Sequence, residues 1–209
     1  MKRLQLIAPL ALCIAAAAGQ PAFAAASNDP DWPCIQRKVP HISPGMVWAG
    51  PPVDEADRSW EKSDELSDLV GRLAQRRLPV EESEPLIEAF AKQHAGDKAR
   101  QLTLLFTGLL QTINRERDDI MTGISRYARQ QRTRAEKIKE LRDRLSALSG
   151  KSQLTESERA KRDTLEEQLS WETRIYDERA ASLTYVCDSP RILEQRLFSL
   201  ARYIQAQLD

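Results

Sequence analysis

The sequence is poor in the residues on which most protein chemistry depends. It has only two histidines and three cysteines, and aromatic residues make up 6% of its 209 residues. It contains none of the motifs typical of zinc proteases, haem attachment, serine hydrolases, dinucleotide binding or phosphate loops. We therefore expect a protein that is not an enzyme and that holds no cofactor.

Proline is missing from a long stretch of the chain. The sequence has 11 prolines, yet none occurs between Pro85 and Pro190, and the one clear helix breaker in this stretch is the segment 149–152, Ser-Gly-Lys-Ser. Charged residues make up 30% of the chain, which together with the few aromatics is typical of solvated helices. The sequence predicts an all-α protein in which two long helices fold back on each other at this turn.

The N-terminus has the pattern of a secretory signal peptide. Two basic residues precede an apolar run from Leu4 to Ala18, and Ala22-Phe23-Ala24 is a small-x-small cleavage site. The apolar run is too short for a membrane anchor, and a large residue before Cys13 disfavours a lipoprotein signal. We predict cleavage after Ala24, export to the periplasm and no membrane span.

The charge balance excludes a general attraction to polyanions. Removal of Lys2 and Arg3 with the signal peptide leaves 29 basic residues against 31 acidic ones. A chain with a net charge near −2 has no overall attraction to nucleic acid or to an anionic membrane. We therefore expect no nucleic-acid partner.

Two cysteines, Cys34 and Cys187, remain after removal of the signal peptide. In an oxidising compartment a disulfide between them is the simplest interpretation. It would close a loop of about 150 residues and contribute about 4–5 kcal/mol in the chain-entropy model. The alternatives are a metal-binding or a redox-active thiolate pair, although the C-x-x-C spacing of such sites is absent.

Residues 25–56 form a segment that we call the strap. Its six prolines exclude a continuous helix or a central strand, and its apolar residues predict an ordered, extended segment lying over a helical body. Trp32 and Trp48 are predicted to anchor it in gaps between helices or, alternatively, to line a groove for a partner or ligand. A weaker alternative is a metal site on the strap, formed by Asp29, Asp31, His41 and Met46.

Residues 57–209 are predicted to form a single helical domain. The spacing of apolar residues and the capping residues at helix ends predict five helices. The first runs from Asp57 or Ser59 to before Pro79, and the second is capped by Ser83. A long third helix begins after the N-cap Asp97, a return helix is capped by Thr155, and a last helix begins at Ser189-Pro190. Gly108 and Gly123 lie inside the long helix, where glycine is unfavourable. They indicate close packing of a neighbour or a kink.

Between about residues 115 and 186 the apolar residues narrow to a seam with alternating three- and four-residue spacing, which is typical of a coiled coil. Pairing Leu148 with Leu154 at the turn places Ile138 opposite Leu165. Residues 125–144 include eight basic and three acidic residues, and residues 156–179 include eight acidic and five basic ones. The sequence therefore predicts an antiparallel hairpin whose two arms form flanking ion pairs, which select register more than they stabilise.

Gln131 and Arg134 interrupt this seam. In the predicted register they lie opposite Trp171 and Glu172, and Arg134 is predicted to bond Glu172 in a polar layer that fixes the register. The alternative is a flexible joint, or a partner-docking notch marked by Trp171. The candidate partner-binding residues are Trp32, Trp48, Trp171 and Arg134.

These patterns favour an exported, non-enzymatic protein that binds another periplasmic or envelope protein through its hairpin and strap, as an adaptor, assembly factor or holdase. The alternative is a ligand- or metal-binding protein that uses the aromatic, methionine and histidine residues of the strap. The same seam can also join two chains, which would give a homo-oligomer.

Overall fold

The computed structural model of the chain describes residues 29–208, and the predicted signal peptide lies outside them. These residues form helices and no strand, which confirms the all-α prediction. The elements are α1 (Pro44–Val47), the 3₁₀ helix η1 (Ser59–Lys62), α2 (Asp64–Ala74), α3 (Ser83–Gln93), the 3₁₀ helix η2 (Ala95–Asp97), α4 (Lys98–Ser149) and α5 (Glu156–Gln205).

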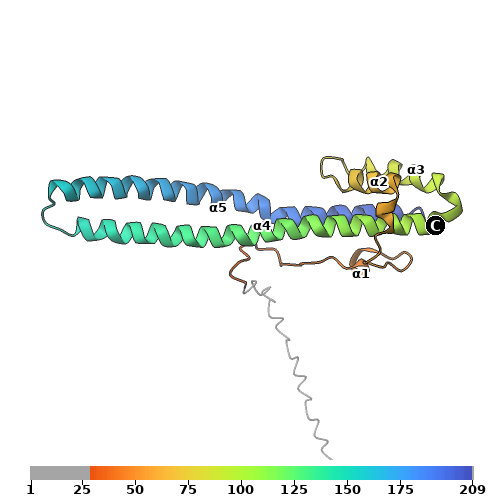
Figure 1. The fold of residues 1–209 in the computed structure, drawn as a ribbon, viewed down its shortest axis with the longest axis horizontal. Helices are drawn as coiled ribbons and strands as arrows, with labels where there is room; N and C mark the ends of the chain where they lie inside the picture. The colour runs from red at the N-terminus through yellow and green to blue at the C-terminus, as the bar shows by residue number, and fades with distance from the viewer. Residues whose placement is uncertain (1–28, 209) are drawn as a thin grey trace, which may run out of the picture.

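Helices α4 and α5 form an antiparallel pair that runs the length of the molecule (Figure 1). The 52 residues of α4 make it about 80 Å long. At one end of the pair, α2 and α3 lie on one side and the strap runs along the other, while the opposite end projects free of them (Figure 1). Among the described residues, no helix is long and apolar enough to cross a membrane.

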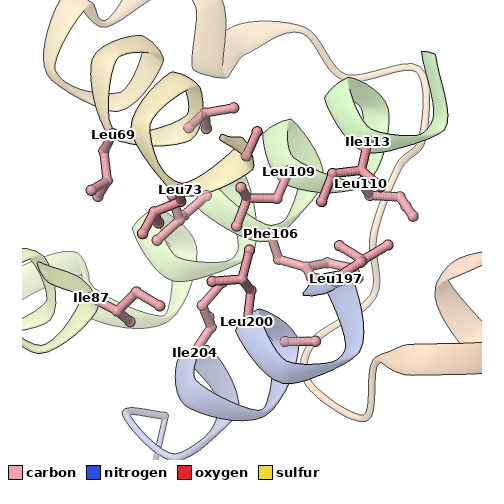
Figure 2. Close-up of a cluster of buried hydrophobic side chains, with 14 of the residues drawn as sticks. Leu69, Leu73, Ile87, Phe106, Leu109, Leu110, Ile113, Leu197, Leu200 and Ile204 are labelled. Carbon is pink, nitrogen blue, oxygen red and sulfur yellow. The ribbon is translucent and has the colours of Figure 1, made fainter. Parts of the chain in front are cut away.

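The main apolar core lies at the end of the pair that α2 and α3 cover. Figure 2 shows Phe106 and Leu109 of α4 between Leu73 of α2 and Leu200 of α5. Residues 102–110 are apolar on nearly all sides, which is typical of a helix surrounded by other helices. Leu102, Leu105, Phe106 and Leu109 are fully buried.

The two glycines of α4 have different surroundings. A Cβ atom at Gly108 would lie 2.7 Å from Val70 Cγ2 and 2.9 Å from Trp60 Cδ2, so close packing explains this glycine. At Gly123 a Cβ atom would meet nothing within 4 Å, and α4 continues through this position without a break. The expectation of a close packing contact is therefore wrong for Gly123, and α4 does not break there.

Some predicted helix ends differ from the observed ones. The first predicted helix divides at Ser63, whose side chain accepts a hydrogen bond from the Leu66 N–H and caps α2. Ser83 is not a cap: it is the first residue of α3 and is fully buried, with its hydroxyl 3.5 Å from the Pro79 carbonyl. The predicted capping box of Thr155 and Glu158 at the start of α5 is present.

The prediction that a separate last helix begins at Ser189-Pro190 is wrong, because α5 continues through Pro190. Proline inside a helix removes one backbone hydrogen bond and costs about 3 kcal/mol. Here tertiary contacts hold the backbone on both sides of the proline. Cys187 is bonded to the strap, and Arg117 Nε of α4 donates to the Pro190 carbonyl at 3.2 Å.

The disulfide between Cys34 and Cys187 joins the strap to α5, with 5.5 Å between the two Cα atoms. Both cysteines are buried in a small cluster with Trp32 of the strap and with Met121 and Ile124 of α4. The strap is thus fixed covalently near the middle of the long helix pair. This is the pairing that the cysteine count predicts.

Candidate functional site

Three polar side chains of α4 hold the backbone of the strap and of the loop that follows it. Asn114 accepts from the Ile42 N–H at 3.0 Å and donates to the Ile42 carbonyl at 2.9 Å. Gln111 donates to the carbonyls of Glu55 and Asp57, and Arg117 Nη2 donates to the Val39 carbonyl at 3.0 Å. They follow one another at three-residue spacing, so that neighbours lie side by side on the helix.

Ion pairs at Asp31 hold the strap near the beginning of its described part. Arg129 and Arg132 of α4 both form ion pairs with Asp31. The hydrogen bond from Arg132, which has the larger effect, and the one from Arg129 hold the pKa of the Asp31 carboxyl below its usual value. The prediction that these arginines pair with the return arm of the hairpin is therefore wrong, because both pair with Asp31 of the strap.

Both strap tryptophans anchor the strap on the helices, which is the first of the two roles predicted for them. Trp32 is buried beside the disulfide, and its indole N–H donates to the Gln36 carbonyl at 2.7 Å. Trp48 stacks on Phe106 of the main core, with 4.1 Å between ring centroids and 10° between ring planes. Trp48 thus packs, partly buried, against the core, whereas Trp32 also borders a groove.

This groove lies between the strap and α5 and has a volume of about 700 Å³. The strap contributes Trp32, Val39, Met46 and Val47, whereas α5 contributes Cys187, Pro190 and Phe198. The size is within the usual range for sites that bind small molecules. The remaining lining side chains are mostly polar or charged: Gln36, Arg37, Arg117, Met121, Arg191, Glu194, Gln195 and Ser199.

Arg117 is the most buried charged group of this groove, with 2% of its side chain exposed. Burial lowers the pKa of its guanidinium, and the charge of Glu194 opposes this shift. Glu194 Oε2 lies 3.8 Å from Arg117 Nη2, beyond hydrogen-bond distance. Within the described residues, Arg117 Nη1 has no hydrogen-bond partner.

The surface around the groove exposes large apolar side chains. Met46 and Phe198 line it and are 51% and 47% exposed. Ile35 on the strap is also exposed, at 102%, and it directly precedes the lining residue Gln36. Apolar side chains gathered around a hollow are typical of binding surfaces.

The polar layer of the hairpin is present where it was predicted. Arg134 and Lys137 of α4 both bond the carboxylate of Glu172, and the hydrogen bond from Lys137 lowers the pKa of Glu172. Gln131 donates to the Tyr176 carbonyl at 3.1 Å, five residues beyond the predicted partner Trp171. Gln131 therefore meets Tyr176 instead of Trp171, while the predicted bond between Arg134 and Glu172 is present.

Trp171 faces away from the seam. It is 56% exposed, and the guanidinium of Arg174, one turn along α5, lies 4.7 Å from the centroid of its ring. Together with Glu167, Gln168 and Ser170, these two residues line a shallow hollow. The prediction that places Trp171 opposite Gln131 is wrong, while its exposure leaves it free to contact a partner.

The four residues of the weaker metal alternative have other contacts or surroundings. His41 Nε2 lies 2.6 Å from Glu55 Oε2, Asp29 pairs with Lys38, and Asp31 pairs with two arginines. Met46 lines the groove, to which His41 does not contribute. Within residues 29–208 no group of three or more histidine, cysteine or acidic side chains is placed to hold a metal ion.

Sequence reasoning missed the two buried arginines, Arg117 and Arg196. Arg196 donates to the carbonyls of Leu73 and Leu78 and thereby holds the end of α2 and the loop after it. A signal for both exists in the sequence. Arg117 continues the buried spacing of Ile113, Met121 and Ile124, and Arg196 lies between the buried Leu193 and Leu200.

No model of a known protein family matches this chain, and neither does any curated protein or solved structure. The proposals below therefore rest on the geometry of the described residues.

Proposed function

We propose that this chain is an exported, non-enzymatic protein that binds another protein of the periplasm or cell envelope, as an adaptor, assembly factor or holdase. The binding surface is the part of the hairpin beyond the strap contacts, residues 133–175, which we call the distal hairpin. The observation that carries the proposal is the exposed Trp171 with Arg174 against its ring, on an arm that projects from the core (Figure 1).

Tryptophan and arginine are the residues most enriched where binding energy concentrates in protein interfaces. Trp171 offers a broad apolar ring, and Arg174 already lies against it, so little side-chain freedom remains to be lost on binding. The hollow beside them has acidic and amide groups on its rim. This combination suits a partner that inserts an apolar side chain and hydrogen-bonds around it.

The arm supports this surface because its two helices are locked in register. Next to Trp171, Glu172 is buried and held by Arg134 and Lys137 of the opposite helix. Near the turn, Leu141, Leu148 and Leu165 form a small apolar cluster. Since Glu172 faces inward in a fixed register, its neighbour Trp171 is held facing outward.

Export is part of the proposal and has two supports. The N-terminal sequence has the features of a signal peptide. The bond between Cys34 and Cys187 is buried, and structural disulfides persist in oxidising compartments such as the periplasm.

The test is site-specific photo-cross-linking in the periplasm of the native host. A benzophenone side chain replaces Trp171 in one variant and Lys161, an exposed residue of the same arm, in the control. We expect a discrete adduct from position 171 that is weak or absent from position 161. Equal adducts from both positions, or none from position 171, would contradict the proposal, and an adduct of twice the chain mass would identify a second copy as the partner.

A further inference from the structure

The groove between the strap and α5 is distinct from the distal hairpin and has features of its own that favour a ligand. Along its length it presents the side chains of Trp32, Val39, Met46, Val47 and Phe198. Met46 and Phe198 are about half exposed, although both line a hollow. An aliphatic chain lying in the groove would cover both of them and exclude water from apolar surface.

The charges around the groove favour an anionic end on that ligand. Arg37, Arg117 and Arg191 line it, against one acidic residue, Glu194. Asp188 lies 3.6 Å from Arg191, whereas Arg37 forms no ion pair within residues 29–208. A cationic or neutral head group would gain nothing from this excess of positive charge.

The buried guanidinium of Arg117 is the second, independent indication. Two of its nitrogens donate to the carbonyls of Pro190 and Val39, which fixes its position between α5 and the strap. The third, Nη1, makes no hydrogen bond to the described residues. A buried donor without a partner is unfavourable, and an ionised oxygen is the acceptor that bonds a guanidinium most strongly.

We propose that this groove binds an aliphatic carboxylate of the fatty-acid class. The chain lies between the strap and α5 over Met46 and Phe198, and the carboxylate approaches Arg117 at the disulfide end, where Cys187 and Pro190 line the groove. This proposal names a ligand class for the alternative function predicted from the aromatic and methionine residues of the strap, which was ligand binding. The inference does not depend on partner binding by the distal hairpin.

The test is calorimetric titration of the mature, disulfide-bonded chain with octanoate, decanoate and dodecanoate below their micelle concentrations. Burial of each methylene group should tighten binding about fourfold. Dodecanoate should bind at least about tenfold more tightly than dodecanol, because only the carboxylate brings an opposite charge to its hydrogen bonds with the guanidinium. Dodecyltrimethylammonium, of the same chain length and opposite charge, should bind more weakly than both.

Two substitutions on α5 form a matched pair for the same titration. Phe198→Asp places a carboxylate in the groove and should weaken dodecanoate binding at least tenfold. Ile192→Asp makes the same change at a residue of similar exposure that does not line the groove, and should leave binding within about twofold. Neither residue is fully buried, so both variants should fold, and circular dichroism checks this.

Any of three results would overturn the inference: no saturable binding of dodecanoate, affinity independent of chain length, or equal effects of the two substitutions. Equal binding of dodecanoate and dodecanol would remove the role of Arg117. Failure here would leave cross-linking at Trp171 unaffected, and the reverse also holds, so the two proposals are separable.

Discussion

The base of this molecule and its distal hairpin are built from the same two helices but are held together in different ways. At the base, α4 and α5 pack against α2, α3 and the strap around fully buried side chains such as Phe106 and Leu200. In the distal hairpin each helix has only the other to pack against, and the buried apolar cluster has three leucines. Fold stability should therefore reside mainly in the base, which leaves the arm free to serve as a contact surface.

The largest expected effect concerns the bond that fixes the strap to the base. The disulfide spans 153 residues of sequence, and loss of the constraint on the unfolded chain should lower the free energy of unfolding by up to about 4–5 kcal/mol. Cys34→Ser combined with Cys187→Ser, measured by urea unfolding, checks this. The unsubstituted protein under dithiothreitol should match the double variant, and an unchanged midpoint in both would show that the disulfide does not contribute to stability.

A pair of leucine substitutions compares the two regions directly. Leu200→Ala removes a fully buried side chain of the base and should cost about 2–5 kcal/mol. Leu165→Ala removes a leucine of the distal cluster and should cost less than half as much, because the thin arm can relax around the gap. The two free energies of unfolding come from the same denaturant experiment, and equal losses would contradict the comparison.

The next effect concerns the polar contacts of the strap. Asn114→Ala leaves the buried N–H and carbonyl of Ile42 without partners, and should lower the free energy of unfolding by about 2 kcal/mol. Hydrogen exchange should speed up in the strap more than in the distal hairpin. Gln130→Ala, an exposed position of α4, is the control and should change neither quantity.

The smallest effect is a pH dependence at the end of the strap. Since Arg132 and Arg129 hold the pKa of Asp31 below its usual value of 3.8, the ion pairs favour the folded strap fully above that value. Their contribution is lost as the pH falls through the lowered pKa. Hydrogen exchange of residues 29–40, corrected for intrinsic rates, should show less protection at pH 3 than at pH 6. Asp31→Asn should shrink that difference, and an unchanged difference would contradict the assignment.

Much of the fold could be predicted because local chemistry specifies it. The turn at Gly150, the capping box at Thr155 and the pairing of Cys34 with Cys187 each depend on few residues close in sequence or on simple counting. Pro190 was misjudged because its helical backbone is held by Arg117 and by the disulfide, which are tertiary contacts. The same holds for the groove, whose walls come from the strap and α5, far apart in the chain.

The register of the hairpin shows how far a periodic pattern can be trusted. The seam predicts that Arg134 meets Glu172, because an arginine and a glutamate interrupt the same apolar stripe, and they do bond. It places Trp171 opposite Gln131, whereas Gln131 donates to the Tyr176 carbonyl. Trp171 was already a candidate partner-binding residue from the sequence, and its side chain is exposed in the structure.

The most direct test of the division between base and arm measures partner binding and stability together on Trp171→Ala. Affinity is measured for the partner that cross-links at position 171, and the melting temperature of the isolated variant is recorded beside it. The structure predicts a loss of affinity of at least about tenfold with a melting temperature unchanged within about 2 °C, because Trp171 lies outside every buried cluster of the described residues. Unchanged affinity, or a loss that follows a fall in melting temperature, would contradict a distal hairpin that binds through this residue.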